Sequence, residues 1–151
     1  MTLILFCRDG EKVHIPAGTL YDNTELFEIP NVGKFEGYGN RNSLNYVDIY
    51  KIPEAKTLIR GTFRYEGWCK ALRKLIEIGW LSDKVDESMV GKTYRQIMAE
   101  SIGEPDSTDV KKDTADRLGL SVDDKIISTF EWLGLFSDEK VLDMTGNISI
   151  I

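Results

Sequence analysis

The spacing of hydrophobic residues changes near residue 66. Before this point, apolar and polar residues alternate in short runs, which is typical of strands. Beyond Gly67, apolar residues recur every three or four positions, which is typical of amphipathic helices. The pattern predicts an α+β fold, with a β-rich part over 1–66, built on a mostly antiparallel or mixed sheet, and a helical lobe over 67–151.

The β-rich part is predicted to begin with a hairpin. Asp9-Gly10 lies between two apolar runs and is a strong turn signal, and Pro16 ends the second strand. Further strands are expected over 25–29, 35–38 and 56–65. In the last of these, alternation would place Leu58, Arg60, Thr62 and Arg64 on one face, and Ile59, Gly61, Phe63 and Tyr65 on the other.

Helices are predicted from capping residues and apolar stripes. Asn40 or Asn42 is expected to cap a short helix over 43–50, and Thr93 a helix that Gly103 and Pro105 close. The other helices are expected over 68–79, 109–118, 121–134 and 137–144. Trp68, Trp80 and Trp132 lie on or beside apolar stripes, so we expect them in the core. The apolar end over 146–151 suggests a piece cut from a longer protein, or else a docked terminal strand.

Composition narrows the function classes. The chain has 19 Lys and Arg against 25 Asp and Glu, a net charge of −6, which disfavours nucleic acid as the main partner. No apolar run approaches the ~20 residues that span a membrane, so no membrane association is expected. Cys7 and Cys69 are the only cysteines and His14 the only histidine, which favours a reducing compartment, the cytoplasm, and disfavours a zinc site.

Candidate chemistry concentrates between Gly37 and Gly67. This stretch carries Arg41, Arg60 and Arg64 within an acidic chain, and guanidinium groups bind carboxylates in bidentate pairs. The alternative is that these arginines form ordinary surface ion pairs, and composition alone does not separate the two interpretations. The chain has no Gly-x-Gly-x-x-Gly fingerprint, P-loop or nucleophile elbow, and no catalytic residue is predicted.

Three motifs in register resemble glutamate-forming saccharopine dehydrogenases (saccharopine reductases). Residues 37–43, GYGNRNS, are similar to the family's Gly-Tyr-Pro-Asn-Arg-Asp-Ser element, and residues 60–65, RGTFRY, to its Arg-Gly-Thr-Leu-Arg-Tyr element. Residues 131–135, EWLGL, resemble a third element. The resemblance covers roughly residues 33 to 136. Three departures are Gly39 and Glu66, where the family has proline, and Asn42, where it has an acid.

The resemblance implies a substrate-binding domain of an oxidoreductase of lysine metabolism. It implies oxidative cleavage of saccharopine to glutamate and 2-aminoadipate 6-semialdehyde, with NAD or NADP held by a Rossmann domain outside this chain. This chain is then expected to bind no cofactor or metal and to be inactive alone, with a homodimer as one expected assembly. The matching positions imply a saccharopine-binding set made up of Asn40, Arg41, Ser43, Thr62, Arg64 and Tyr65.

Two alternatives stay open at this point. One is a relative that acts on a carboxylated polyamine such as carboxynorspermidine. The other is a ligand-binding or interaction module without catalysis. The helical stretch from Trp68 to Phe136 and the EWLGL element favour the saccharopine branch.

Overall fold

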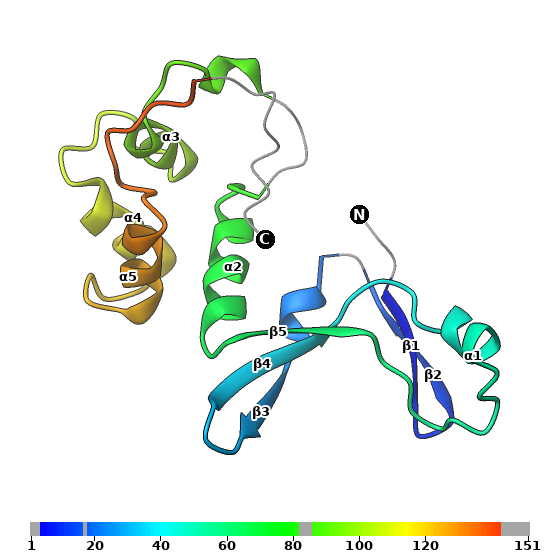
Figure 1. Ribbon diagram of the computed structural model, residues 1–151. Coiled ribbons are helices and arrows are strands. Elements are labelled where there is room, and N and C mark those ends of the chain that lie inside the picture. The colour runs from blue at the N-terminus through cyan, green and yellow to red at the C-terminus, as the bar shows by residue number, and fades with distance from the viewer. Residues whose placement is uncertain (1–3, 17, 82–85, 143–151) are drawn as a thin grey trace. The chain divides into compact units, whose positions relative to one another are not determined.

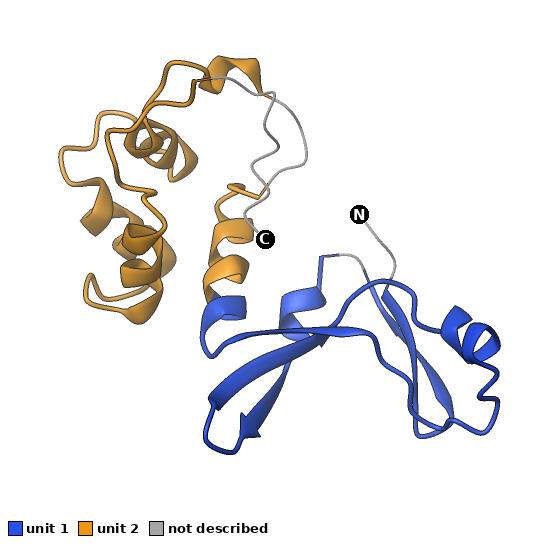
Figure 2. Cartoon of the chain, viewed as in Figure 1, with its two compact units in different colours: residues 1–70 blue, residues 71–151 orange. Residues whose placement is uncertain are grey.

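The computed structural model describes residues 4–16, 18–81 and 86–142, in which small antiparallel sheets are followed by helices (Figure 1). This order confirms the predicted α+β class. Contacts divide the chain into two compact units, residues 1–70 and 71–151 (Figure 2). The division falls inside helix α2 (Trp68–Glu77), a little beyond the expected boundary at Glu66-Gly67. Within the described residues, no helix is both long and apolar enough to cross a membrane.

The first unit begins with the predicted hairpin. Strand β1 (Ile4–Arg8) pairs antiparallel with β2 (Glu11–Ile15). Asp9 and Gly10 both have positive φ, 52° and 87°, as the tight turn that matches strand twist requires. A small core forms on the hairpin from Ile4, Phe6 and Ile15, against which Val13, Leu20 and Ile59 pack.

A three-stranded antiparallel sheet follows the short 3-10 helix η1 (Leu20–Asp22). Its order is β3 (Glu25–Ile29), β4 (Gly33–Gly39) and β5 (Gly61–Tyr65), so the expected strands over 25–29 and 35–38 are confirmed. In the β4–β5 pair, Phe35 lies opposite Tyr65 and Gly39 opposite Gly61.

The two faces of this sheet differ in chemistry. Strand alternation places Glu36, Tyr38, Thr62 and Arg64 together on one face, named here the polar face. The other, the aromatic face, carries four rings in mutual contact, with centroids 5.1–6.4 Å apart: Phe27, Phe35, Phe63 and Tyr65. Glycine is required beside these rings, because a Cβ at Gly37 would lie 2.5 Å from the Phe27 ring.

The chain between β4 and β5 carries helix α1 (Asn45–Tyr50). Asn42 Oδ1 accepts a hydrogen bond of 2.9 Å from the backbone N–H of Leu44, ahead of the helix. The prediction that Asn40 or Asn42 caps a helix over 43–50 is wrong, because the helix starts at Asn45, its N-cap residue is Leu44, and no side chain caps it. The helix ends at Lys51, whose φ of 55° is left-handed, before Pro53.

The prediction of one continuous strand over 56–65 is wrong, because only Gly61–Tyr65 belongs to β5. The preceding residues contact the hairpin instead. Leu58 forms an isolated antiparallel bridge with Cys7, and Gly10 N–H donates to the Lys56 carbonyl at 2.8 Å. The chain therefore pairs first with the hairpin and then, from Gly61 onward, with β4.

The second unit is helical, and local capping explains where its helices start. Beyond η2 (Glu87–Met89), α3 (Tyr94–Ser101) starts at a capping box formed by Thr93 and Gln96. Asp109 caps α4 (Val110–Leu118) and Asp124 caps α5 (Lys125–Trp132). The centre of this unit is filled by side chains less than 2 % exposed: Leu72, Leu75, Met98, Ile127, Phe130 and Leu135.

Three expectations for the second unit are corrected. Helix α5 starts at Lys125 and not at Ser121, because Asp124 supplies the cap. Residues 137–142 are not helical, since the carbonyls of Ser137 and Glu139 accept hydrogen bonds from the first turn of α3. Trp132 is 77 % exposed and is not a core residue. Met144 and the apolar end over 146–151 lie outside the described residues.

Candidate anion-binding site

The polar face of the sheet brings two predicted site residues into direct contact. Asn40 Nδ2 donates a hydrogen bond of 2.9 Å to Thr62 Oγ1, from the end of β4 to the middle of β5. Asn40 N–H also donates to the Arg60 carbonyl at 2.8 Å, so antiparallel pairing continues one step beyond Gly39 and Gly61. Asn40, Thr62 and Arg60 therefore belong to one continuous surface.

Ser43 fixes the loop that follows Asn40. Its side chain is fully buried, its N–H donates to the Leu5 carbonyl at 2.7 Å, and its Oγ accepts from Arg60 N–H at 2.8 Å. Between these anchors, Arg41 has a φ of 69°, a left-handed conformation that is uncommon outside glycine. Arg41 is thus an exposed side chain on a tightly bonded turn.

The arginines of this surface have no carboxylate partner in the described ranges. In the part of the chain that the structure describes, neither Arg41 nor Arg60 nor Arg64 forms an ion pair with an acidic side chain. By contrast, Arg8 pairs with Glu25, and Arg95 pairs with Asp138 at 3.1 Å. Among the described residues, these three arginines therefore do not form the ordinary surface ion pairs of the alternative interpretation, although 25 acidic residues are present in the sequence.

Arg64 lies among the phenols and the thiol of the polar face. Burial raises the pKa of Tyr38 most, and the Arg64 guanidinium opposes this by its charge and by a hydrogen bond to the phenol. Burial also raises the pKa of Tyr21, whose ring meets Tyr38 edge-on at 5.6 Å, again with Arg64 opposing. Arg64 Nη1 donates to the Phe63 carbonyl at 3.3 Å, so this side chain is already partly oriented.

Glu36 joins the polar face to the start of α2. The residue is 7 % exposed, and its carboxylate accepts hydrogen bonds from Gly67 N–H at 3.0 Å and from Cys69 N–H at 2.8 Å. Burial, followed by the hydrogen bond and charge of Glu36, raises the pKa of the Cys69 thiol to about 12. Glu36 thus holds the first turn of the helix and keeps this thiol protonated.

A dinucleotide cofactor does not fit this junction. A strand-to-helix turn binds pyrophosphate through free N–H groups at the start of the helix. At the β5–α2 turn, two of these groups already donate to the Glu36 carboxylate, whose negative charge would repel phosphate. Among the described residues there is also no group of three His, Cys, Asp or Glu side chains that could hold a metal ion.

A pocket of about 650 Å³ lies between the hairpin and the sheet. Its lining includes Phe6, Phe27 and Phe63 together with the paired Arg8 and Glu25. Because this pair neutralises itself, the pocket offers an anion little attraction. Of the six predicted site residues, Thr62 is the one that lines it.

The structure brings together most, but not all, of the predicted set. Asn40 contacts Thr62, and Ser43 is bonded to the backbone of Arg60. Arg64 shares the polar face with Thr62, whereas Tyr65 is 78 % exposed on the aromatic face. The sequence motifs also predict that Arg41 and Arg64 point into one open cleft, and this stays a prediction. Sequence reasoning missed Glu36 and Tyr38, which the alternation of β4 could have indicated.

Arg64 on the polar face, with Arg41 and Arg60 in the segments beside it, defines an α+β domain suited to an anionic ligand. The family model described as "Saccharopine dehydrogenase C-terminal domain" matches residues 4–148, and the chain belongs to this family.

Full-length relatives agree with this assignment. The chain is 38% identical over 148 residues to "Saccharopine dehydrogenase [NADP(+), L-glutamate-forming]" of Saccharomyces cerevisiae, and 31% identical over 142 residues to the protein of that name from Pyricularia oryzae. Each match covers 90% of this chain and 32% of the relative. The match to mouse "Alpha-aminoadipic semialdehyde synthase, mitochondrial" is 32% identical and covers 88% of the chain and 15% of that protein. The chain thus spans about a third or less of these relatives.

A solved structure shows the same fold. It is described as "Apo histidine-tagged saccharopine dehydrogenase (L-Glu forming) from Saccharomyces cerevisiae". The TM-score is 0.74 at 30% sequence identity, and the match covers 92% of this chain and 33% of that one.

Proposed function

We propose that this chain is the saccharopine-binding domain of an NAD(P)-dependent, glutamate-forming saccharopine dehydrogenase of lysine metabolism. The observation that carries the proposal is that Arg64 on the polar face, and Arg41 and Arg60 in the segments beside it, have no acidic partner among the described residues, within a chain of net charge −6. Saccharopine has three carboxylates, and guanidinium groups are suited to hold them. The names of the relatives support the same substrate.

The role of this chain in the reaction is to hold the substrate in place. A nicotinamide cofactor, held by a Rossmann domain of the same polypeptide, would supply the hydride acceptor for the carbon beside the secondary amine. Arg41 and Arg64 bind substrate carboxylates, and Thr62 with Asn40 offers a hydroxyl and an amide near them. Fixing the substrate at several points favours reaction, because its orientation is set before the chemical step.

Ser43 acts differently from the expected direct contact. Because its side chain is fully buried and its Oγ is bonded to Arg60 N–H, we assign it a positioning role in the loop that carries Arg41. Tyr65 extends from the aromatic face, so its contact with saccharopine is the part of the proposed set that the described geometry supports least.

Calorimetric titration of the purified chain with saccharopine tests the proposal. Arg41→Ala and Arg64→Ala should each weaken binding about ten- to hundredfold, because a hydrogen bond to a charged group contributes about 1.5–3 kcal/mol. Lysine at either position should restore only part of the affinity, since an ammonium group lacks the bidentate fork. Unchanged affinity in both alanine variants would contradict the assignment of these residues.

We further propose a homodimer and a reducing compartment, the cytoplasm. In the described sheet, β3 and β5 are edge strands, and every residue of β3 is exposed, which favours pairing with a second copy. Cys7 and Cys69 are free thiols, which is usual in the cytoplasm. Sedimentation equilibrium that finds only monomer at micromolar concentration would contradict the dimer.

A further inference from the structure

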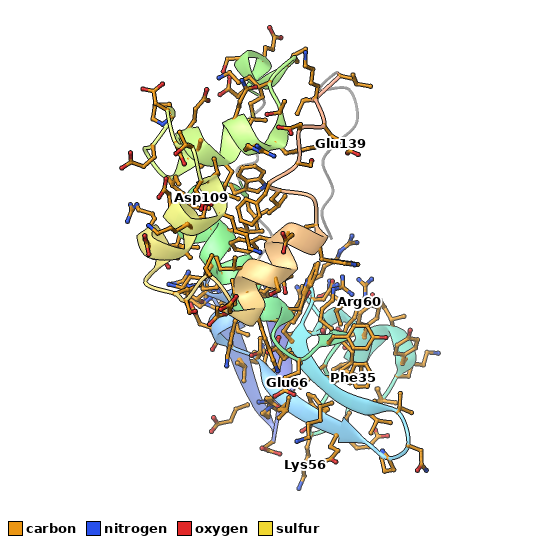
Figure 3. The ribbon with its side chains drawn as sticks, turned by 90° about the vertical axis from the view of Figure 1, so that its left-hand side faces the viewer. Phe35, Lys56, Arg60, Glu66, Asp109 and Glu139 are labelled. Carbon is orange, nitrogen blue, oxygen red and sulfur yellow. The ribbon has the colours of Figure 1, made fainter. Side chains whose placement is uncertain are left out.

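The pocket between the hairpin and the sheet is built mainly on the aromatic face. Gly39 and Gly61, which lie opposite each other on β4 and β5, form its floor, and Phe63 lies two residues further along the same face. Phe35, which Figure 3 labels, belongs to the outer part of this face and is not among the lining residues. The floor of the pocket is therefore on the other side of the sheet from Arg64, the arginine of the polar face.

An open space lies above Gly61 on this face, named here the Gly61 slot. Among the described residues, a Cβ at Gly61 would have only backbone atoms of Tyr38 within 4 Å, so no side chain covers this position. By contrast, a Cβ at Gly39 would lie 3.3 Å from the buried ring of Phe6. Phe63, which is 53 % exposed, stands beside the slot. Aromatic walls on a bare backbone floor suit one large apolar side chain of a ligand.

Arg8 and Glu25 form the charged rim of this pocket. Their side chains are ion-paired, and the Arg8 guanidinium also lies over the Phe6 ring, 5.3 Å from its centroid. Arg8 is thereby held against the same ring that contacts Gly39. Among the described residues, these are the side-chain contacts of Arg8 and Glu25, so several guanidinium N–H donors and one carboxylate oxygen are open to a ligand.

The charges of the rim suit a ligand that carries both signs. The lining holds the carboxylates of Asp22 and Glu25 against one guanidinium, that of Arg8, so it attracts an ammonium group and disfavours a ligand of net negative charge. The open N–H donors of Arg8 suit a single carboxylate. A zwitterionic α-amino acid carries both groups on one carbon atom. The pocket volume of about 650 Å³ is that of a small-molecule site.

We propose that this pocket binds a free α-amino acid with a large apolar side chain. The ammonium group contacts Glu25, the carboxylate contacts Arg8, and the side chain lies in the Gly61 slot beside Phe63. Arg8 belongs to β1 and Glu25 to β3, so an amino acid that contacts both connects the hairpin to the sheet and stabilises the first unit. This site does not depend on the proposed function, which concerns the arginines on and beside the polar face.

NMR titration of the isotope-labelled chain with L-phenylalanine tests the site. For a ligand of this size we expect a Kd on the order of 1 mM, with shifts at the amides of Gly39, Gly61 and Phe63. N-acetyl-L-phenylalanine keeps the ring and the carboxylate but has no ammonium group, so it should bind about tenfold more weakly or less. If these amides do not shift at L-phenylalanine concentrations up to about ten times the expected Kd, the proposal is overturned.

Glu25→Gln separates a contact with the ammonium group from a structural role. It should weaken L-phenylalanine about tenfold and strengthen N-acetyl-L-phenylalanine, because the Arg8 guanidinium then lacks its carboxylate partner. A structural role of Glu25 alone would not change the two affinities in opposite directions. Glu28→Gln is the matched control, since Glu28 is exposed on the same strand and does not line the pocket. If Glu25→Gln and Glu28→Gln bind both compounds alike, the proposal is wrong.

Phe63→Ala tests the wall of the Gly61 slot. It should weaken L-phenylalanine severalfold, because part of the apolar contact is lost. Leu26→Ala is its control, since Leu26 is similarly exposed, at 57 %, but does not line the pocket, and its replacement should leave the affinity unchanged. Equal affinities of these two variants would contradict the placement of the ligand side chain. Circular dichroism spectra confirm that each variant is folded.

Discussion

The carboxylate of Glu36 should be one of the largest single contributors to stability in the first unit. It accepts two backbone hydrogen bonds, from Gly67 at 3.0 Å and Cys69 at 2.8 Å, and it is almost fully buried. Hydrogen bonds to a charged group contribute about 1.5–3 kcal/mol each, and a negative charge at a helix N-terminus adds about 0.3–1 kcal/mol. Glu36→Gln keeps one acceptor oxygen but turns an amide NH₂ group towards one of the N–H donors.

We therefore expect Glu36→Gln to lower the free energy of unfolding by about 2–4 kcal/mol. For a chain of this length, the midpoint of thermal unfolding should fall by about 4–16 °C. Urea unfolding followed by circular dichroism measures the loss. Amide hydrogen exchange read by NMR localises it, because the amides of Gly67 and Cys69 should lose protection first.

Glu28→Gln is the control for this substitution. Glu28 lies on β3 and is exposed, and its side chain has no hydrogen bond or ion pair among the described residues. Its replacement should change stability by no more than about 0.5 kcal/mol. If Glu36→Gln unfolds at the urea concentration of Glu28→Gln, or if the Gly67 and Cys69 amides stay protected, the capping role is refuted.

Three further predictions concern the thiol, the sheet and the activity. The folded pKa of Cys69, about 12, lies above its usual value of 9.0, so the unfolded chain loses this proton first. Stability should therefore fall as the pH rises from 9 towards 12, and urea unfolding of Cys69→Ala should lack this component. Gly61→Ala should cost about 1–3 kcal/mol in urea unfolding, because the new Cβ would lie 2.9 Å from the Tyr38 carbonyl oxygen, a backbone atom that cannot move aside. The purified chain with saccharopine should not reduce NAD or NADP, measured by nicotinamide absorbance, and turnover would contradict our account of the β5–α2 turn.

Local signals made much of the fold predictable. Asp9-Gly10 specifies its own turn, and Thr93 and Asp109 each accept a hydrogen bond from the N–H group three residues further on, so sequence spacing is enough to find them. The failures involve partners distant in sequence. Residues 56–58 pair with the hairpin, and residues 137–139 accept bonds from the start of α3, some forty residues earlier. The spacing of apolar residues along a sequence does not show which distant segments will pair.

The candidate site likewise has features that the sequence predicts and features that it does not. Alternation along β5 correctly places Thr62 and Arg64 on one face and Tyr65 on the other. The burial of Ser43 and the capping role of Glu36 were not predictable, because each depends on a hydrogen bond across the fold. The continued register at Asn40 and Arg60 likewise needs both strands to be aligned before it can be seen.

The bonds that join Asn40, Ser43 and Arg60 have a consequence for insertions and deletions. They close the base of the long connection between β4 and β5, which carries α1, so the two ends of this connection stay in place whatever its length. Lengthening a closed loop costs little, about 0.6 kcal/mol for each doubling. Residues added beside the exposed Pro53 and Glu54 should therefore be tolerated. A single residue added between Asn40 and Ser43 would shift Arg41 out of place. Peptide tags should therefore be inserted at the tip of the β4–β5 connection and not at its base.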